Sequence, residues 1–262
     1  MFDFLKKSKK PKIRFYSLVD GLAETSPIIP ATSYKRQWFT EQKPHPQDGM
    51  RSADCPGVKL LINSGWIVTA PADFGIKTNG DGFSFEYREA YRFDHMKDGD
   101  YRKYVSQHDD YQSEPMIECP HKQLATIVKL DTPWRFEIDD EWMLLQLPVS
   151  YNKETRFTTC PGFLDPRYGH VINVQMFWHS LDAEETVTAG TPICQLIPVR
   201  RQEYMAGQWD AIVDTATEYD KQRERAFNYA VDSVFLDNDK LKSRLKRVRE
   251  VLNKYRIGDN NG

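Results

Sequence analysis

The sequence predicts a mainly β protein of antiparallel strands with a helical extension at its C-terminal end. Three observations support this fold class. Residues 124–200 form a series of short apolar runs separated by Pro, Gly or Asp turns. Thr, Val, Ile, Tyr and Phe are spread through the first 200 residues, a composition that favours strands. After Arg200-Arg201 proline disappears, charges become dense and apolar residues recur at helical spacing.

The length of 262 residues favours one principal core, because single-domain sandwiches and barrels commonly run to about 200–250 residues. We therefore expect a basic, poorly ordered tail at residues 1–12 and a β domain at 13–201. A two-helix extension is expected at 202–258. Residues 88–120 are rich in tyrosine and charge, and we interpret them as an insertion in the β domain.

The first part of the β domain has fewer regular patterns. Five prolines between residues 22 and 57 exclude long helices there, so a surface meander is expected. A short helical turn is predicted at 58–65, and Gly65 would close it. Strands are predicted at residues 13–19, 66–70 and about 83–87.

The second part is more regular. Strands are predicted at residues 124–130, 134–138, 143–147, 171–178, 185–187 and 193–198. Successive short strands with no helix between them argue against a doubly wound nucleotide-binding fold. A closed barrel or a sandwich of antiparallel strands is therefore expected.

The C-terminal extension is predicted to contain a helix over residues 202–233 and a second helix after Asp237-Asn238-Asp239. The second helix would carry one apolar stripe, formed by Leu241, Leu245, Val248, Leu252 and Tyr255, and a basic opposite face. Such a stripe must pack on its own domain, a sister subunit or another protein, because an isolated helix of this length is marginal. Nucleic-acid binding through the basic face is the less favoured alternative.

The net charge and the cysteines limit the binding partners, the cellular location and the metal sites that we expect. The net charge of −2 gives no general attraction to nucleic acid or to anionic membranes. No apolar run is long enough to span a bilayer, and the first lysines follow the apolar residues, unlike a secretory signal. A cytoplasmic protein is expected, in the host cytoplasm if it is phage-encoded. The four cysteines show no C-x-x-C spacing, so free thiols and no metal site are expected.

The segment Gly162-Phe163-Leu164-Asp165-Pro166-Arg167-Tyr168-Gly169-His170-Val171 resembles the core of the dUTPase and dCTP-deaminase superfamily. Chains of that superfamily carry a Gly-φ-Ile-Asp-x-x-Tyr-x-Gly turn, and a later strand that ends in Ala-Gln-Leu. Here Gly190-Thr191-Pro192-Ile193-Cys194-Gln195-Leu196-Ile197 matches that strand. The resemblance covers about residues 124–200. It implies a β-clip fold and a homo-oligomer, with a trimer as the candidate assembly because superfamily sites lie between subunits.

The chain also resembles a family of uncharacterised phage and bacterial proteins. The matching residues are Phe15–Leu18, Cys55–Gly57 with Gly65–Asp73, and Gly190–Arg201. This second resemblance spans most of residues 13–201. It implies the fold but no activity.

The superfamily resemblance gives two candidate catalytic residues. In dUTP hydrolysis the Asp of the turn activates the attacking water and the Tyr packs against the deoxyribose. Asp165 and Tyr168 match those positions. The structural alternative is an Asp that hydrogen-bonds its own turn and a Tyr that packs on a neighbouring strand.

Other parts of the superfamily's apparatus are missing from the sequence. Residues 147–153 lack the Arg-Ser-Gly phosphate loop, and no Gly-rich arm follows Arg201. The strand at 171–178 offers Asn173 and Gln175 where deaminases carry a catalytic Glu. These departures argue against catalysis.

Three functions are therefore carried forward. The first is a non-catalytic β-clip-like protein of phage type that acts in assembly or binding, without a cofactor. The second is a nucleotide-binding protein or divergent dUTPase-like hydrolase that would use Mg²⁺. Its candidate ligand-binding residues are Arg156, Arg167, Gln195, Arg200 and Arg201. The third is a virion structural or decoration protein, which would self-associate strongly.

Overall fold

The computed structural model describes residues 12–44, 46, 51–89, 104–117, 122–205 and 210–231, and six positions between 243 and 253. The chain divides into two compact units. The β unit comprises Met1–Gln37 and Lys59–Gln208, and the helical unit comprises Trp38–Val58 and Trp209–Gly262. The predicted tail, apart from Lys12, lies outside the described residues, and so do 90–103 and 118–121 of the predicted insertion and its flank.

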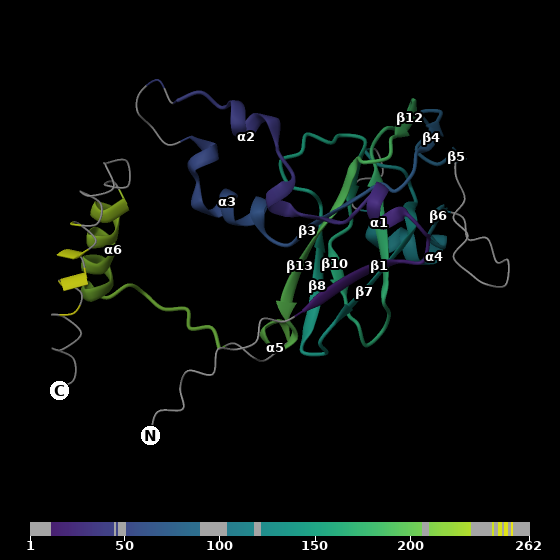
Figure 1. Cartoon of the computed structure of the whole chain (residues 1–262). Coiled ribbons are helices and arrows are strands. Elements are labelled where there is room, and N and C mark those ends of the chain that lie inside the picture. Colours follow the sequence, from purple (N-terminus) through teal and green to yellow (C-terminus); the bar gives the residue numbers. More distant parts are fainter. Residues whose placement is uncertain are drawn as a thin grey trace. The chain divides into compact units, whose positions relative to one another are not determined.

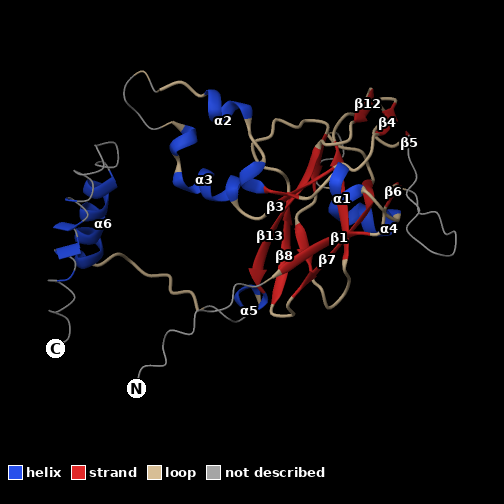
Figure 2. Ribbon diagram, viewed as in Figure 1, coloured by secondary structure: helices blue, strands red, loops and turns tan. Residues whose placement is uncertain are grey.

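The described residues of the β unit form three antiparallel sheets (Figures 1 and 2). The first has the order β1 (Ile13–Ser17), β7 (Ile127–Ile138), β11 (Val171–Trp178), β9 (Phe157–Thr159), and β6 (Val105–Gln107) also pairs with β7. The second has the order β10 (Gly162–Leu164), β8 (Trp142–Leu147), β13 (Pro192–Arg200), β3 (Trp66–Thr69), β2 (Ile29–Pro30). The third has the order β12 (Glu184–Val187), β4 (Phe74–Thr78), β5 (Phe85–Glu89).

The mainly β fold class is thus confirmed. In the part of the chain that the structure describes, each sheet is open and none closes on itself. Of the two predicted arrangements, packed open sheets describe the β unit and a closed barrel does not.

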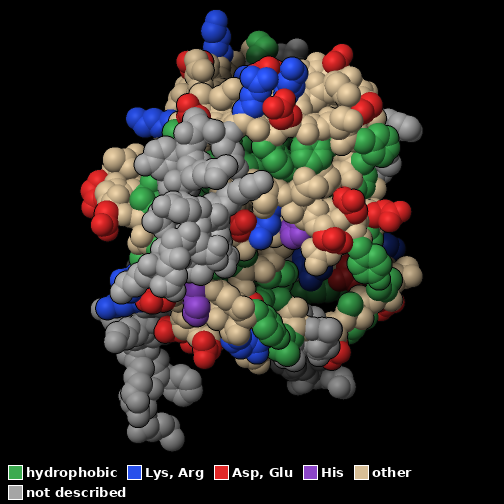
Figure 3. Space-filling view, turned by 90° about the vertical axis from the view of Figure 1, so that its right-hand side faces the viewer, with side chains coloured by type: hydrophobic (Ala, Val, Ile, Leu, Met, Phe, Trp, Pro, Cys, Tyr) green, Lys and Arg blue, Asp and Glu red, His purple; other side chains and the backbone are tan. Residues whose placement is uncertain are grey.

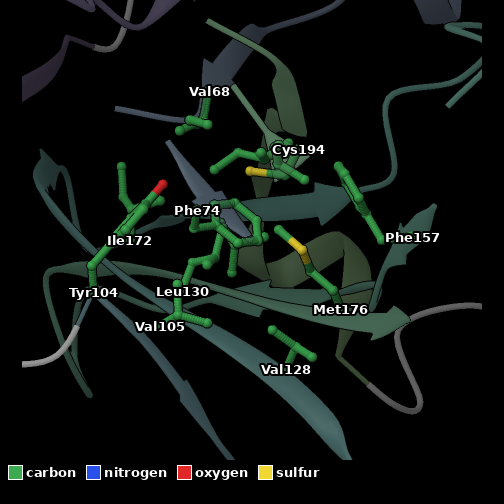
Figure 4. Packing of buried hydrophobic residues seen from close by; sticks show 14 of the residues in the cluster. Val68, Phe74, Tyr104, Val105, Val128, Leu130, Phe157, Ile172, Met176 and Cys194 are labelled. Carbon is green, nitrogen blue, oxygen red and sulfur yellow. The ribbon is translucent and has the colours of Figure 1, made fainter. Parts of the chain in front are cut away.

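One hydrophobic core joins the three sheets. Alternate residues of β11 point inward, as the period of a strand requires. They meet Val68 and Leu196 from the second sheet and Phe74 from the third. Figure 4 shows side chains from all three sheets converging, with Phe74 near the centre of the labelled group. Burial of each large apolar side chain stabilises the fold by about 1.5–3 kcal/mol, so this core is the main source of stability.

β7 is one strand, whereas the sequence predicted two strands at 124–130 and 134–138. The proline between them, Pro133, lies at an irregularity in the pairing of β7 with β11. The pairing of β11 with β7 shifts register between Val171 and Asn173. At this position the Thr132 hydroxyl donates to the carbonyl of Ile172 (2.5 Å) and accepts from the amide of Trp134 (3.3 Å). A proline is tolerated at such a bulge, since the ladder is already interrupted.

Short helices lie between the strands and after the last strand. They are α1 (Leu22–Thr25), η1 (Ala31–Ser33), α2 (Gln37–Glu41), η2 (Ser52–Asp54), α3 (Pro56–Asn63), α4 (Asp110–Ser113), η3 (Glu114–Met116) and α5 (Arg201–Tyr204). The predicted meander at 22–57 therefore contains helical turns, but its prolines keep each of them short.

The end of α3 is fixed against β13. Gly65 has φ of +68°, and a Cβ placed there would lie 1.9 Å from the carbonyl oxygen of Leu196. The Gln195 amide nitrogen donates to the carbonyl oxygens of Leu61 (2.8 Å) and Ser64 (2.6 Å). Gln195 thus caps α3, since carbonyls at a helix end have no partner within the helix.

The helical unit contains α6 (Glu218–Val231). The predicted helix over 202–233 is wrong over residues 210–217, which are not helical, whereas 202–204 belong to α5 and 218–231 form α6. The Thr217 hydroxyl accepts from the amide of Asp220 (3.3 Å), and the Asp220 carboxylate accepts from the amide of Thr217 (2.9 Å). This reciprocal cap starts α6. The apolar stripe of the second predicted helix lies outside the described residues.

None of the described helices has the length and apolar character that crossing a bilayer requires.

Candidate functional site at the Asp165 turn

The candidate site begins where two strands of the second sheet end. β10 and β13 both run antiparallel to β8, so they end toward the same end of β8. Leu164 pairs with Leu144, and Arg200 pairs with Trp142. Asp165 and Arg201, the residues that follow these strands, are therefore brought together although 36 positions separate them.

The turn after β10 is closed by its own hydrogen bonds. The Asp165 carboxylate accepts from the backbone amide of Arg167 (2.9 Å). Its carbonyl oxygen accepts from the amides of Tyr168 (3.0 Å) and Gly169 (3.2 Å). Pro166 suits the second position of such a turn. Asp165 therefore hydrogen-bonds its own turn, as the structural alternative to a catalytic role requires.

Two arginines hold the Asp165 carboxylate. Arg201 donates from Nη2 to Oδ1 (2.9 Å) and from Nη1 to Oδ2. Arg167 donates from Nη2 to Oδ2 (3.0 Å) and from Nε to Oδ1 (3.3 Å). Together with the backbone amide of Arg167, the two guanidinium groups direct five hydrogen bonds at this carboxylate. An ionised carboxylate offers about four lone-pair positions, so all of its acceptor sites are used. We call Asp165, Arg167 and Arg201 the arginine clasp.

Arg201 also fixes the start of β8. It is only 8% exposed, and its Nε donates to the carbonyl oxygen of Asp140 (3.0 Å). Its Nη2 donates to the carbonyl oxygen of Trp142 (3.3 Å). Its backbone amide donates to the carbonyl oxygen of Glu141 (2.9 Å). A buried charge is tolerated when it is paired and hydrogen-bonded. The clasp therefore ties the β10 turn, the start of β8 and the start of α5 into one structure.

The electrostatics follow from this geometry. The hydrogen bonds from Arg201, and then those from Arg167, hold the pKa of Asp165 well below its usual range, against an opposing effect of burial. A general base is most effective when its pKa lies near the working pH. A carboxylate held in this state is therefore a poor base for activating water.

Tyr168 and Arg200 lie beside the clasp but do not enter it. Tyr168 is 86% exposed, and the Arg167 guanidinium lies 5.6 Å from its ring centre. Arg200 places its guanidinium 5.3 Å from the ring centre of Trp142.

The other two candidate ligand residues have separate partners. Arg156 donates to the carboxylate of Glu154 (2.8 and 2.7 Å) and to the carbonyl of Thr186. Gln195 caps α3, and it precedes Arg200 by five strand residues, a separation of roughly 16 Å. The five candidate ligand residues are therefore not gathered into one pocket.

The described residues contain no group of three or more His, Cys, Asp or Glu that could hold a metal ion. The Asp165 carboxylate does not fit Mg²⁺ in this arrangement, since it would first have to release both arginines. Burial raises the pKa of the Cys160 thiol to about 11, and it also raises that of Cys194. Neither thiol is set up as a nucleophile or a metal ligand.

An exposed aromatic pair lies next to the clasp and was not singled out in the sequence. Phe163 and Tyr204 are 48% and 52% exposed, and their ring centres lie 5.4 Å apart in an edge-to-face arrangement. Phe163 lies on β10, the edge strand of its sheet. β10 has only three residues, too few to show the alternation that marks a strand.

No family model matches the sequence. No curated protein matches it either. Among solved structures, the chain is similar to a mutant dUTPase from phage phi11 of S. aureus, described as coordinating a structural Mg(II) ion. The two share 9% identity with a TM-score of 0.33, and the match covers 79% of this chain and 98% of that one. This resemblance is distant, and the site is interpreted from its own geometry.

Proposed function

We propose that this chain is a non-catalytic β-clip-like protein that acts in assembly or binding, and that its dUTPase-like turn is a structural element. The observation that carries the proposal is the arginine clasp. Both oxygens of Asp165 are directed at Arg167 and Arg201, and Arg201 is buried. Neither oxygen is left to orient a water molecule.

Release of the carboxylate for catalysis would be costly. It would leave the Arg201 guanidinium buried without an anion, and breaking a buried ion pair in this way costs about 3–5 kcal/mol. A nucleotide hydrolase would have to meet this cost in every cycle. The second function, nucleotide binding or hydrolysis, is therefore the less favoured one.

The aromatic pair supports the assembly part of the proposal. Phe163 and Tyr204 expose large apolar rings beside an edge strand, and Met205 is also exposed next to Tyr204. Aromatic side chains are enriched where protein surfaces bind each other. An unpaired strand edge adds a further tendency to associate. We propose that this patch is the contact between copies of the chain in a homo-oligomer, with a trimer as the candidate assembly.

The helical unit offers a second binding surface. α6 exposes Phe227 and Tyr229, each 58% exposed, although side chains of this kind are usually more buried. We propose that this helix docks on a protein partner. A virion component, the third function, would use the same surfaces to form larger assemblies.

Two measurements on the purified protein test the proposal. The first is pyrophosphate and phosphate release from deoxyuridine and deoxycytidine triphosphates with Mg²⁺, for which we expect no turnover above the protein-free control. Turnover that Asp165→Asn abolishes would instead establish the hydrolase.

The second measurement is sedimentation velocity over a range of protein concentrations. We expect one discrete oligomer that Phe163→Ser with Tyr204→Ser dissociates. Phe83→Ser, which removes an exposed ring elsewhere in the β unit, is the matched control and should leave the oligomer intact. A monomer at every concentration contradicts the assembly proposal, and large open assemblies support the virion alternative.

A further inference from the structure

A cavity lies in the β unit apart from the Asp165 turn, between the turn before β5, the strand β6 and the helix α4. Its volume is about 540 Å³, within the range of roughly 300–1,000 Å³ typical of small-molecule sites. Figure 3 looks onto the side of the molecule that carries these elements, and it shows a hollow bordered by hydrophobic and acidic side chains together with basic ones and a histidine. The polar and aromatic lining residues are Phe83, Phe85, Gln107, Asp110, Glu114 and Thr126.

Hydrogen bonds hold the backbone that carries the aromatic wall. The Asp81 carboxylate accepts from the amides of Phe83 (2.7 Å) and Ser84 (2.7 Å) and from the Ser84 hydroxyl (2.6 Å). The carbonyl of Gly82 accepts from the amide of Ala125 at the base of the cavity (2.8 Å). The backbone of Phe83 is therefore fixed, while its ring is 71% exposed. A fixed backbone lowers the conformational entropy that is lost when such a ring binds a ligand.

The acidic wall is formed by α4 and η3. The Asp109 carboxylate accepts from the amide of Tyr111 (2.9 Å) and starts the helix. Asp110 and Glu114, four positions apart, then face the same side, and both line the cavity. Neither forms an ion pair with another of the described residues. Among the residues that the structure describes, the two carboxylates that border the cavity thus have no cation in an ion pair with them.

The base of the cavity adds an unpartnered polar group. Thr126 lines the cavity and is 4% exposed. Within the described part of the chain its hydroxyl has no hydrogen-bond partner. Buried polar groups are nearly always paired, and this hydroxyl oxygen is itself buried beneath the cavity surface.

We propose that the cavity binds an organic cation, with an ammonium or guanidinium group carried on an apolar stem. Asp110 and Glu114 supply charge-assisted hydrogen bonds to the cationic head. Phe83 and Phe85 supply ring faces for the cation and apolar contact for the stem. Phosphates and other anions are excluded because both carboxylates repel them. The source of the cation is either a free amine or a Lys or Arg side chain of a peptide.

The experiment measures binding by ligand-observed NMR titration of the full chain. The probes are benzylammonium and its neutral counterpart, benzyl alcohol, with acetyl-Gly-Lys-Gly-amide and acetyl-Gly-Arg-Gly-amide as peptide probes. The variants are Asp110→Asn with Glu114→Gln, and separately Phe83→Ala, whose exposed ring can be removed without opening the core. Glu24→Gln removes an exposed carboxylate that does not line the cavity and is the control for loss of a surface carboxylate.

We expect saturable binding of a cation that the double variant weakens at least tenfold, that Phe83→Ala weakens at least threefold and that Glu24→Gln leaves unchanged. Benzyl alcohol should bind at least tenfold more weakly than benzylammonium. Tighter binding of a peptide probe than of benzylammonium identifies a peptide side chain as the source, and the reverse identifies a free amine. If no cation saturates, or if the double variant changes nothing, the proposal is overturned.

Discussion

Arg201 holds both carboxylate oxygens of Asp165, with its Nη2 2.9 Å from Oδ1 and its Nη1 on Oδ2. The pair joins the ends of β10 and β13, because both strands flank β8 and end near its start. The residue that resembles a catalytic aspartate is thereby part of the framework. Four predictions test this relationship and the packing around it.

Asp165→Asn should lower the free energy of unfolding by about 1–3 kcal/mol. This is less than the cost of losing the whole ion pair, because the amide removes the anion from Arg201 but keeps one acceptor oxygen for it. Urea unfolding measures the change. Glu137→Gln is the matched control, since it removes the carboxylate of an exposed ion pair with Arg14. Pairs of that kind contribute about 0–1 kcal/mol. Equal effects in the two variants would contradict a structural role for Asp165.

The stability of the chain should depend on pH through Asp165. Its pKa is lowered in the folded state by Arg201 and Arg167, whereas an unfolded Asp has a pKa of about 3.9. The stabilisation is therefore complete above the unfolded value and is lost as pH falls through it toward the folded value. The difference in melting temperature between wild type and Asp165→Asn should shrink as pH falls from about 6 to about 2.5, a range that brackets the unfolded pKa. A constant difference across this range would rule out the linkage.

Gly65→Ala should prevent folding or destabilise the β unit by more than about 3 kcal/mol, the scale at which packing and strain defects become exceptional. Its Cβ would overlap the carbonyl of Leu196, and its φ of +68° is unfavourable for alanine. Gly57→Ala is the matched control, because nothing lies within 4 Å of the added Cβ. That change in α3 should be neutral or stabilise by up to about 1 kcal/mol. Thermal unfolding followed by circular dichroism compares them.

Gln195→Met should destabilise the fold by about 1–3 kcal/mol, because the carbonyls of Leu61 and Ser64 lose their buried donor. Methionine keeps the length and apolar body of the side chain. Chemical denaturation measures the loss of stability. Gln42 is not a suitable control, because its side chain accepts a hydrogen bond from the amide of Ala53. Gln202→Met, at an exposed position, serves instead. No loss in the Gln195 variant would show that water replaces the amide.

The strands that the sequence predicted carry either alternation or a short apolar run. β11 buries every second residue, and β3, with two successive buried residues, follows Gly65 as expected. β9 and β10 were missed because each has three residues around Cys160-Pro161, a length too short for periodicity. β4 was missed because its second residue is Gly75, and glycine is uncommon in strands.

The candidate site could be predicted only in part. Asp165 and Arg201 were both singled out from the sequence, but as a catalytic residue and a phosphate ligand. Their pairing depends on the strand order β10, β8, β13, and no local pattern encodes the order of strands. The acidic and aromatic cavity could not be predicted for the same reason. Phe83 and Glu114 line it together only because elements that are distant in the sequence lie side by side.

The most direct test of the clasp is the coupling free energy between Asp165 and Arg201, from urea unfolding of Asp165→Asn, Arg201→Met and the double variant. Residues joined in one ion-pair network couple by about 0.5–3 kcal/mol, and we predict about 2 kcal/mol here. The double variant should therefore be much less destabilised than the sum of the single changes. A coupling within about 0.3 kcal/mol of zero, the limit for independent sites, would mean that the carboxylate is free of Arg201 and available for chemistry.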